Sequence, residues 1–220
     1  MLKVQNLSFS YKSSSTLLKD ISYSFDKNQI YGLVGANGAG KTTFFKLLLD
    51  QLKPQTGTIS INNLNSGKDR KKYRDQFIFS VEEPQFLPYL TGMEWLLFVL
   101  ASYHKKADQK KLQELIDIFS FPEIESQTEE YSHGMSKKLS MIISLMVNPY
   151  CLLFDESFAG IDPFISKKIH EYFISIKKDK IILISSHNKD VTENLFDTIL
   201  FLKNGTFKII ERFDDIFDEK

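Results

Sequence analysis

The feature that constrains this sequence most is a glycine-rich octapeptide between an apolar run and an amphipathic run. The octapeptide is Gly35-Ala36-Asn37-Gly38-Ala39-Gly40-Lys41-Thr42, and Thr43 follows it directly. Residues 30–34 (Ile-Tyr-Gly-Leu-Val) are typical of a short strand, and residues 43–49 have the periodicity of an amphipathic helix. A G-x-x-x-x-G-K-[ST] sequence between a strand and a helix predicts a loop that wraps a phosphate group.

The residue types in this loop suit that chemistry. Gly35, Gly38 and Gly40 lack Cβ, so backbone N–H groups can approach an anion closely. The helix that begins near Lys41 adds unpaired N–H donors and the positive end of its dipole. Lys41 supplies a charge for the β- and γ-phosphates, and the Thr42 hydroxyl is a ligand for Mg²⁺. We therefore expect a nucleotide site built on Gly35, Ala36, Asn37, Gly38, Ala39, Gly40, Lys41, Thr42 and Thr43.

Length and charge narrow the class of protein. The chain of 220 residues is long enough for one sizeable core, and its 28 Lys+Arg and 28 Asp+Glu leave a net charge of +0. No global field draws it to nucleic acid, so we expect no nucleic-acid partner. A single cysteine excludes a disulfide framework and fits a reducing cytoplasm. The sequence contains no signal-peptide or membrane-spanning pattern, so we expect a soluble protein that reaches a membrane only through a partner.

Hydrophobic periodicity predicts the arrangement of strands and helices. Period-two alternation over residues 2–11 and 21–25, with a third run at 58–61, indicates an antiparallel layer around the phosphate loop. A strand at 77–81 is followed by helical patterns within residues 84–148. Within that region, Thr91 and Glu94 have the spacing of a capping box, and further helices are expected at 110–119 and 136–147.

These patterns predict an α/β fold in a single domain over residues 1–220. It has a P-loop, RecA-like core with a mainly parallel sheet, an N-terminal antiparallel β layer, and an inserted helical subdomain at about 84–148. The acidic tail at 211–220 carries no functional interpretation.

Two other apolar runs end in side chains that suit phosphate chemistry. Residues 151–154 lead to Asp155 and Glu156. At the end of a buried strand, Asp155 is placed to ligate a phosphate-bound Mg²⁺, and Glu156 to orient or deprotonate an attacking water. Residues 180–186 end at His187, a candidate contact for the γ-phosphate. A lone histidine there is also compatible with a purely structural role.

Two weaker candidates complete the set. Residues 131–135 (Tyr-Ser-His-Gly-Met) open the helix that leads to the Asp155 strand, and they bring Ser132 and Gly134 to a helix N-terminus, a generic anion site. Tyr11 precedes the loop at a spacing that allows it to stack on a base. Taken alone, the first is also a capped helix and the second an ordinary strand aromatic.

Together and in this order, the motifs resemble the nucleotide-binding domain of an ABC transporter, from Tyr11 to about Gly205. The correspondences are Gly35–Thr42 with Walker A, 131–135 with the LSGGQ-type signature, 152–156 with Walker B and its catalytic glutamate, 159–163 with the D-loop, His187 with the switch histidine, and Tyr11 with the base-stacking aromatic. The resemblance implies ATP and Mg²⁺ as ligands. It also implies head-to-tail pairing of two domains, as a homodimer or with a paralogue, in which Ser132 and Gly134 reach the γ-phosphate of the other protomer.

The sequence departs from the family pattern at four positions. Glu82 stands where the family has its Q-loop glutamine, which places a third candidate ligand near Mg²⁺ beside Thr42 and Asp155. His133 replaces the second signature residue, Ser157 follows the catalytic glutamate in place of the usual proline, and Ile161 replaces the D-loop leucine. None of these changes removes a phosphate ligand, but Glu82 and His133 leave open how fast ATP is turned over and how turnover is coupled to transport.

The stretch Glu82–Phe98 is the expected partner surface. It carries Phe86, Leu87, Tyr89, Leu90 and Trp95 and is stiffened by Pro84 and Pro88. Apolar residues on such a loop are unusual at a surface unless something covers them, although they can also pack inward as core. In the resembling family this region receives a short helix of the membrane-spanning subunit.

Three other functions remain open on the sequence alone. One is a soluble ABC-type ATPase that works on ribosomes or DNA, although the chain lacks a second such domain or a long coiled coil. A P-loop GTPase or kinase is another, but the N-K-x-D spacing is not met at 188–191. The last is a low-activity regulatory subunit, which Glu82 and His133 suggest. The leading interpretation is an ATPase subunit on the inner face of a membrane.

Overall fold

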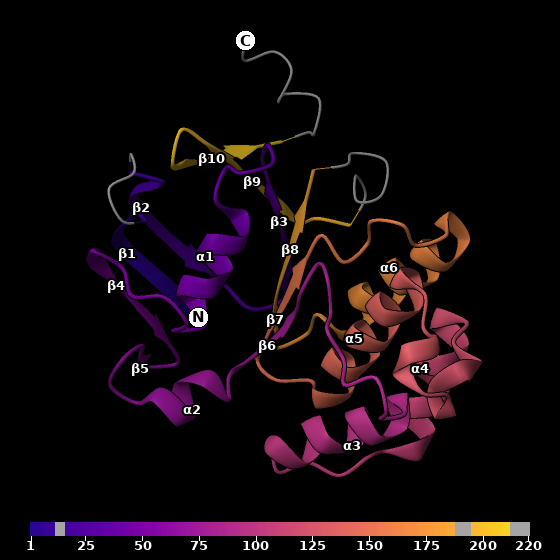
Figure 1. The fold of residues 1–220 in the computed structure, drawn as a ribbon. Coiled ribbons are helices and arrows are strands. Elements are labelled where there is room, and N and C mark those ends of the chain that lie inside the picture. The colour runs from indigo at the N-terminus through magenta and orange to yellow at the C-terminus, as the bar shows by residue number, and fades with distance from the viewer. Residues whose placement is uncertain (12–15, 188–194, 212–220) are drawn as a thin grey trace.

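Two β-sheets enclose the helix that follows the phosphate loop (Figure 1). The structure is a computed structural model, and it describes residues 1–11, 16–187 and 195–211. One sheet is antiparallel, with strand order β2-β1-β4-β5. Its strands are β1 (Leu2–Phe9), β2 (Leu18–Phe25), β4 (Thr56–Ile61) and β5 (Leu64–Asn65). The predicted N-terminal antiparallel layer is confirmed.

Strand β1 changes the face it buries part-way along. Val4 lies opposite Tyr23, but the register then shifts so that Leu7 faces Ile21. The shift occurs at Asn6, whose φ is 49°. A bulge of this kind inserts one residue and reverses the alternation, which is why buried positions change from even to odd numbers. The predicted strand run to Tyr11 is wrong at its end, because β1 stops at Phe9 and Tyr11 lies beyond the ladder.

The second sheet carries the strand ends that were predicted to meet. Its order is β10-β9-β3-β8-β7-β6, and every neighbouring pair is parallel except β9 with β10. The strands are β3 (Gln29–Val34), β6 (Phe77–Ser80), β7 (Cys151–Asp155), β8 (Ile181–Ser186), β9 (Thr198–Lys203) and β10 (Thr206–Ile210). The mainly parallel core sheet is thus confirmed, with β3, β7 and β8 side by side.

The helices fall into two groups about this sheet (Figure 1). Helix α1 (Lys41–Leu48) lies on one side, between the sheets, and α2 (Arg70–Arg74) is a short helix before β6. On the other side lie α3 (Gly92–Ser102), α4 (Gln109–Phe119), α5 (His133–Val147) and α6 (Pro163–Ile176), with short 3₁₀ turns at Pro122–Glu125 and Thr128–Glu130. As predicted, α3, α4 and α5 follow β6 and precede β7.

The capping box at α3 has the predicted geometry. Thr91 Oγ1 accepts a hydrogen bond from the Glu94 backbone N–H at 3.1 Å, and Glu94 Oε2 accepts one from the Thr91 N–H at 2.8 Å. The two bonds satisfy donors that a helix start would otherwise leave unpaired.

Two cores cover the two faces of the parallel sheet. Cys151 and Leu153 of β7 pack in the cluster that contains α1, whereas Leu152 and Phe154 pack with the helices on the opposite face. A strand buried on both faces needs apolar residues at every position, which explains the unbroken apolar run before Asp155. In the described part of the chain, no helix has the length and apolar character needed to cross a membrane. Most of the acidic tail, residues 212–220, lies outside the described residues.

Candidate functional site

The phosphate loop joins the end of β3 to the start of α1. Gly40 is the N-cap of α1 with φ 112°, a conformation that a side chain would strain, and it offers no side chain to cap the first helical N–H groups. A Cβ on Gly35 would lie only 2.7 Å from the Leu202 carbonyl oxygen, so glycine is needed there for close packing. No side chain of the N-cap residue therefore competes with an anion at this helix start, although the Ala39 N–H of the loop donates to the Ala36 carbonyl at 3.1 Å.

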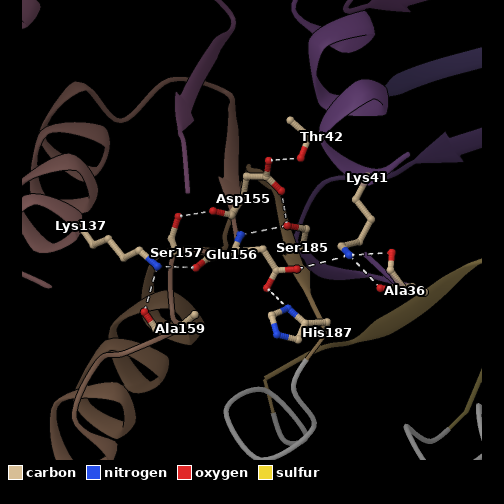
Figure 2. Close-up of polar contacts among 11 residues, drawn as sticks. Ala36, Lys41, Thr42, Lys137, Asp155, Glu156, Ser157, Ala159, Ser185 and His187 are labelled. Atoms are coloured by element: carbon tan, nitrogen blue, oxygen red, sulfur yellow. Dashed lines mark hydrogen bonds and ion pairs between the residues drawn. The ribbon is translucent and has the colours of Figure 1, made fainter. Parts of the chain in front are cut away.

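Lys41 lies folded back on its own loop. Its Nζ donates to the Gly35 carbonyl at 2.7 Å and to the Ala36 carbonyl at 3.4 Å (Figure 2). The same ammonium lies 3.4 Å from Glu156 Oε1, and both side chains are only 7% exposed. The candidate phosphate cation and the candidate base thus form a buried ion pair.

Asp155 and Thr42 meet across the interface between β7 and α1. The Thr42 hydroxyl donates to Asp155 Oδ2 at 2.6 Å, and the other carboxylate oxygen accepts from Ser185 Oγ at the end of β8 (Figure 2). Three segments that are far apart in sequence therefore converge at one edge of the sheet, as the rule for parallel strand ends requires. The sequence interpretation placed Asp155 and Thr42 together but missed Ser185. The only sequence signal for Ser185 is its position two residues before His187, at the end of the same strand.

Glu156 and His187 are also in contact. His187 Nδ1 lies 2.9 Å from Glu156 Oε2, so a ring protonated at that nitrogen donates to the carboxylate. Glu156 has a φ of 47° and is buried, whereas the His187 side chain is 46% exposed. Lys137 of α5, which the sequence did not single out, is buried and donates to the backbone carbonyls of Glu156 at 3.4 Å and Ala159 at 3.0 Å.

A cavity of about 470 Å³ lies over the loop, and other candidate site residues line it. Tyr11 and Glu82 both line it, together with Asn37, Gly38, Gly40, Lys41, Thr42, Thr43 and Glu156. The Tyr11 hydroxyl lies 3.1 Å from Thr43 Oγ1, so its ring is held at the mouth of the loop although it lies outside β1. Glu82 also lines a smaller hollow beside Thr42 and Asp155. Both residues are therefore near the site that the sequence assigned to them.

Ser132 and Gly134 do not line this cavity. Ser132 is the N-cap of α5, and its Oγ accepts from the Met135 N–H at 3.3 Å. The preceding Tyr131 fixes this helix start, because its hydroxyl donates to the Glu123 carbonyl at 2.7 Å and burial raises its pKa to about 12. The two candidate signature residues thus lie at a helix end that is separate from the phosphate loop of the same chain.

Comparison with known proteins decides the family. A family model described as ABC transporter matches residues 18–159, more than half of the chain. The chain belongs to the ABC transporter family. It is 30% identical over 209 residues to the ABC-type transporter ATP-binding protein EcsA of Bacillus subtilis (strain 168), covering 93% of this chain and 84% of that protein.

Two further likenesses cover the whole chain. The energy-coupling factor transporter ATP-binding protein EcfA1 of Mycoplasmoides gallisepticum is 29% identical over 229 residues, covering 100% of this chain and 81% of that protein. A solved structure described as the ATP binding subunit of an ABC transporter superposes with a TM-score of 0.86 at 28% identity, over 100% of this chain and 92% of that one. Across the first five relatives, the chain spans from 56% to 85% of the relative's length.

This ABC ATPase is an ATP-binding and ATP-hydrolysing subunit of a membrane transporter. The family assignment replaces the GTPase and kinase interpretations, whose test segment, 188–191, lies outside the described residues. The predicted resemblance to the nucleotide-binding domain of an ABC transporter is confirmed, and the family model matches residues 18–159.

Proposed function

We propose that the chain binds ATP with Mg²⁺ in the cavity over Gly35–Thr43 and hydrolyses it with Glu156 as general base. The observation that carries this proposal is the convergence of Lys41, Glu156 and His187 within one set of contacts at the mouth of the loop. ATP phosphates would draw Lys41 away from Glu156 and free that carboxylate to accept a proton from the attacking water. His187 would hold Glu156 and contact the γ-phosphate, and Tyr11 would stack on the base.

The residues beside the loop fit a magnesium ion that is held largely by phosphates. Among the described residues, no three His, Cys, Asp or Glu side chains converge as a metal-binding group. A phosphate-bound Mg²⁺ needs only one or two protein ligands, and the Thr42 hydroxyl and Asp155 carboxylate, 2.6 Å apart, are oxygen donors of that kind. Glu82 adds a carboxylate to the same hollow. When bound, the metal would neutralise charge that develops on the phosphates.

Two copies of the domain, or this chain and a paralogue, would complete the site. Ser132 and Gly134 lie outside the cavity of their own chain, on a helix start that carries unpaired N–H donors. We propose that they bind the γ-phosphate held by the other protomer in a head-to-tail pair. ATP then stabilises the pair and its hydrolysis releases it, which is a ligand-biased two-state switch.

The membrane-spanning subunit would dock on the stretch Glu82–Phe98. A groove of about 450 Å³ lies between β6, α3 and α5, and it is lined mainly by apolar side chains, including Phe79, Val81, Phe86, Trp95 and Val99. Phe86 packs edge-on against Trp95 at 5.5 Å and so forms part of the groove wall, whereas Tyr89 is 65% exposed. Trp95 Nε1 is buried and has no hydrogen-bond partner among the described residues.

Such a partner would place this ATPase on the cytoplasmic face of a membrane. The relatives are transporter proteins, which favours this arrangement over an ABC ATPase acting away from membranes. A low-activity regulatory subunit is the alternative that a turnover assay separates most directly.

Phosphate release by the purified chain tests the proposal. We expect steady turnover with ATP and Mg²⁺, none with excess EDTA, and a loss of about 10²-fold or more in Glu156→Gln. Turnover in Glu156→Gln that stays near the wild-type rate would move the general base to another residue, and a wild type without turnover would identify a regulatory subunit.

A further inference from the structure

Glu156 is held in a backbone conformation that residues other than glycine rarely adopt. Its φ of 47° lies in the left-handed region, which persists at functional sites only where the surroundings enforce it. The peptide between Asp155 and Glu156 is fixed on both edges. The Glu156 N–H donates to Ser185 Oγ at 2.9 Å, and the Asp155 carbonyl accepts from Ser157 Oγ at 3.3 Å. Ser157 therefore holds one edge of the peptide that sets the direction of the catalytic carboxylate.

Ser157 is also the inner end of a chain of hydroxyl groups. Its Oγ is also within 3.3 Å of Ser80 Oγ and of the Ser80 carbonyl oxygen, and can donate to either. Ser80 Oγ lies 2.9 Å from Ser140 Oγ, and either of these hydroxyls can be the donor. Ser80 and Ser157 are both 0% exposed, whereas Ser140 lines the groove between β6, α3 and α5. The chain thus runs from the groove, across the end of β6, to the residue that follows Glu156.

A chain of hydroxyls has a direction, because each hydroxyl has one proton to donate. When Ser140 donates inward, Ser80 Oγ already accepts one hydrogen bond and is a poorer acceptor for a second, so Ser157 donates instead to a backbone carbonyl, that of Asp155 or of Ser80. When an acceptor in the groove takes the Ser140 proton, Ser80 donates to Ser140 and Ser157 donates to Ser80. The Asp155 carbonyl then loses its hydroxyl donor.

We propose that Ser157 is a positioning residue for Glu156, and that the Ser140–Ser80–Ser157 chain makes this positioning depend on what occupies the groove. A hydrogen-bond donor presented to Ser140 by the partner holds Glu156 in its catalytic direction, and an acceptor releases it. The proposal rests on the proposed role of Glu156 as general base. It gives the groove a route to the catalytic residue that uses this chain's own serines, including the one that stands in place of the family's usual proline.

The first test separates positioning from binding. We expect Ser157→Ala to lower kcat about tenfold, equivalent to about 1.4 kcal/mol, with ATP affinity within about twofold of wild type. The matched control is Ser144→Ala, one turn further along α5. Its hydroxyl donates to the Ser140 backbone carbonyl at 2.9 Å and, among the described residues, takes no part in the Ser140–Ser80–Ser157 chain, so kcat should stay within about twofold. Should Ser157→Ala fail to fold, Ser157→Cys keeps the shape and weakens the donor.

The second test reads the direction of the chain. Ser140→Asp supplies only acceptors, whereas Ser140→Asn has nearly the same shape and supplies a donor as well. We expect kcat of the aspartate variant to be about threefold to fivefold below that of the asparagine variant. Adding Ser80→Ala to both should remove that difference, since it cuts the chain; an effect of charge or folding alone would survive it.

The outcomes are distinct. Wild-type kcat in Ser157→Ala, with Glu156→Gln inactive, would overturn the positioning role while leaving the proposed function intact. Equal kcat in the two Ser140 variants, or a difference that persists with Ser80→Ala, would overturn the link to the groove. Normal turnover in Glu156→Gln would instead refute the role of Glu156 on which both depend.

Discussion

The buried ion pair between Lys41 and Glu156 predicts that Glu156→Gln binds nucleotide more tightly than wild type while it loses turnover. Glu156 Oε1 lies 3.4 Å from Lys41 Nζ, and both side chains are 7% exposed. Incoming phosphates must draw the lysine from that carboxylate. A glutamine at this position removes the competing charge, and it also removes the repulsion between a carboxylate and the γ-phosphate. Both effects act in the same direction.

The size of the effect follows from the distance. Two unit charges 3.4 Å apart attract by about 5 kcal/mol at an effective dielectric constant of about 20. Most of this attraction offsets the cost of burying both charges, so only a fraction of it opposes the binding of phosphates to Lys41. The Gly35 and Ala36 carbonyls also keep Lys41 partly satisfied when Glu156 is neutral. We take about 1 to 1.4 kcal/mol as the free energy of nucleotide binding that the ion pair costs the wild type, which corresponds to a fivefold to tenfold lower Kd for Glu156→Gln.

Calorimetric titration with a non-hydrolysable ATP analogue and Mg²⁺ measures this difference directly. Wild type and Glu156→Gln are compared with Glu171→Gln, the same chemical change at an exposed position on α6, for which we expect the wild-type Kd. An unchanged or weaker affinity in Glu156→Gln would show that the Lys41–Glu156 pair does not compete with nucleotide, and would refute the electrostatic argument.

Other variants test the rest of the site. Lys41→Ala should weaken ATP binding at least tenfold in the same titration, about 1.4 kcal/mol, because the phosphate charge loses its buried cation; an unchanged affinity would contradict the phosphate-loop assignment. Mixing a Ser132→Ala protein with Lys41→Ala should recover ATPase activity through one intact composite site, whereas mixed dimers with no activity would contradict action in trans. Tyr89→Asp should keep ATPase activity but lose co-purification with the membrane complex. Ile174→Asp, the same substitution at another exposed apolar residue, is the control and should still co-purify. Burial raises the pKa of the Cys151 thiol in the folded protein, so on raising the pH the thiol of the unfolded chain ionises first. The contribution of Cys151 to stability is therefore present below about pH 8.5 and lost above it. The denaturation midpoint of the wild type should fall more between pH 8 and 10 than that of Cys151→Ala, and equal falls would contradict this linkage.

The sequence by itself determined the elements that depend on local pattern and spacing. The glycines and Lys41 of the phosphate loop, the apolar run that ends at Asp155 and the capping box at Thr91 were all readable, because each is set by neighbours within a few residues. The rule that parallel strands end at one edge then brought Asp155, Glu156 and His187 together without coordinates.

Tertiary structure decided the features that depend on partners distant in sequence. The end of β1 at Phe9 follows from its pairing with Leu18, and no periodicity in the first eleven residues shows where that pairing stops. The left-handed turn at Glu156 requires hydroxyl groups from β8 and from the residue after it, and the buried ammonium of Lys137 comes from α5. Hydrogen bonds and ion pairs of this kind form between whichever polar groups the packing leaves together, so their geometry is fixed only when the core around them is complete.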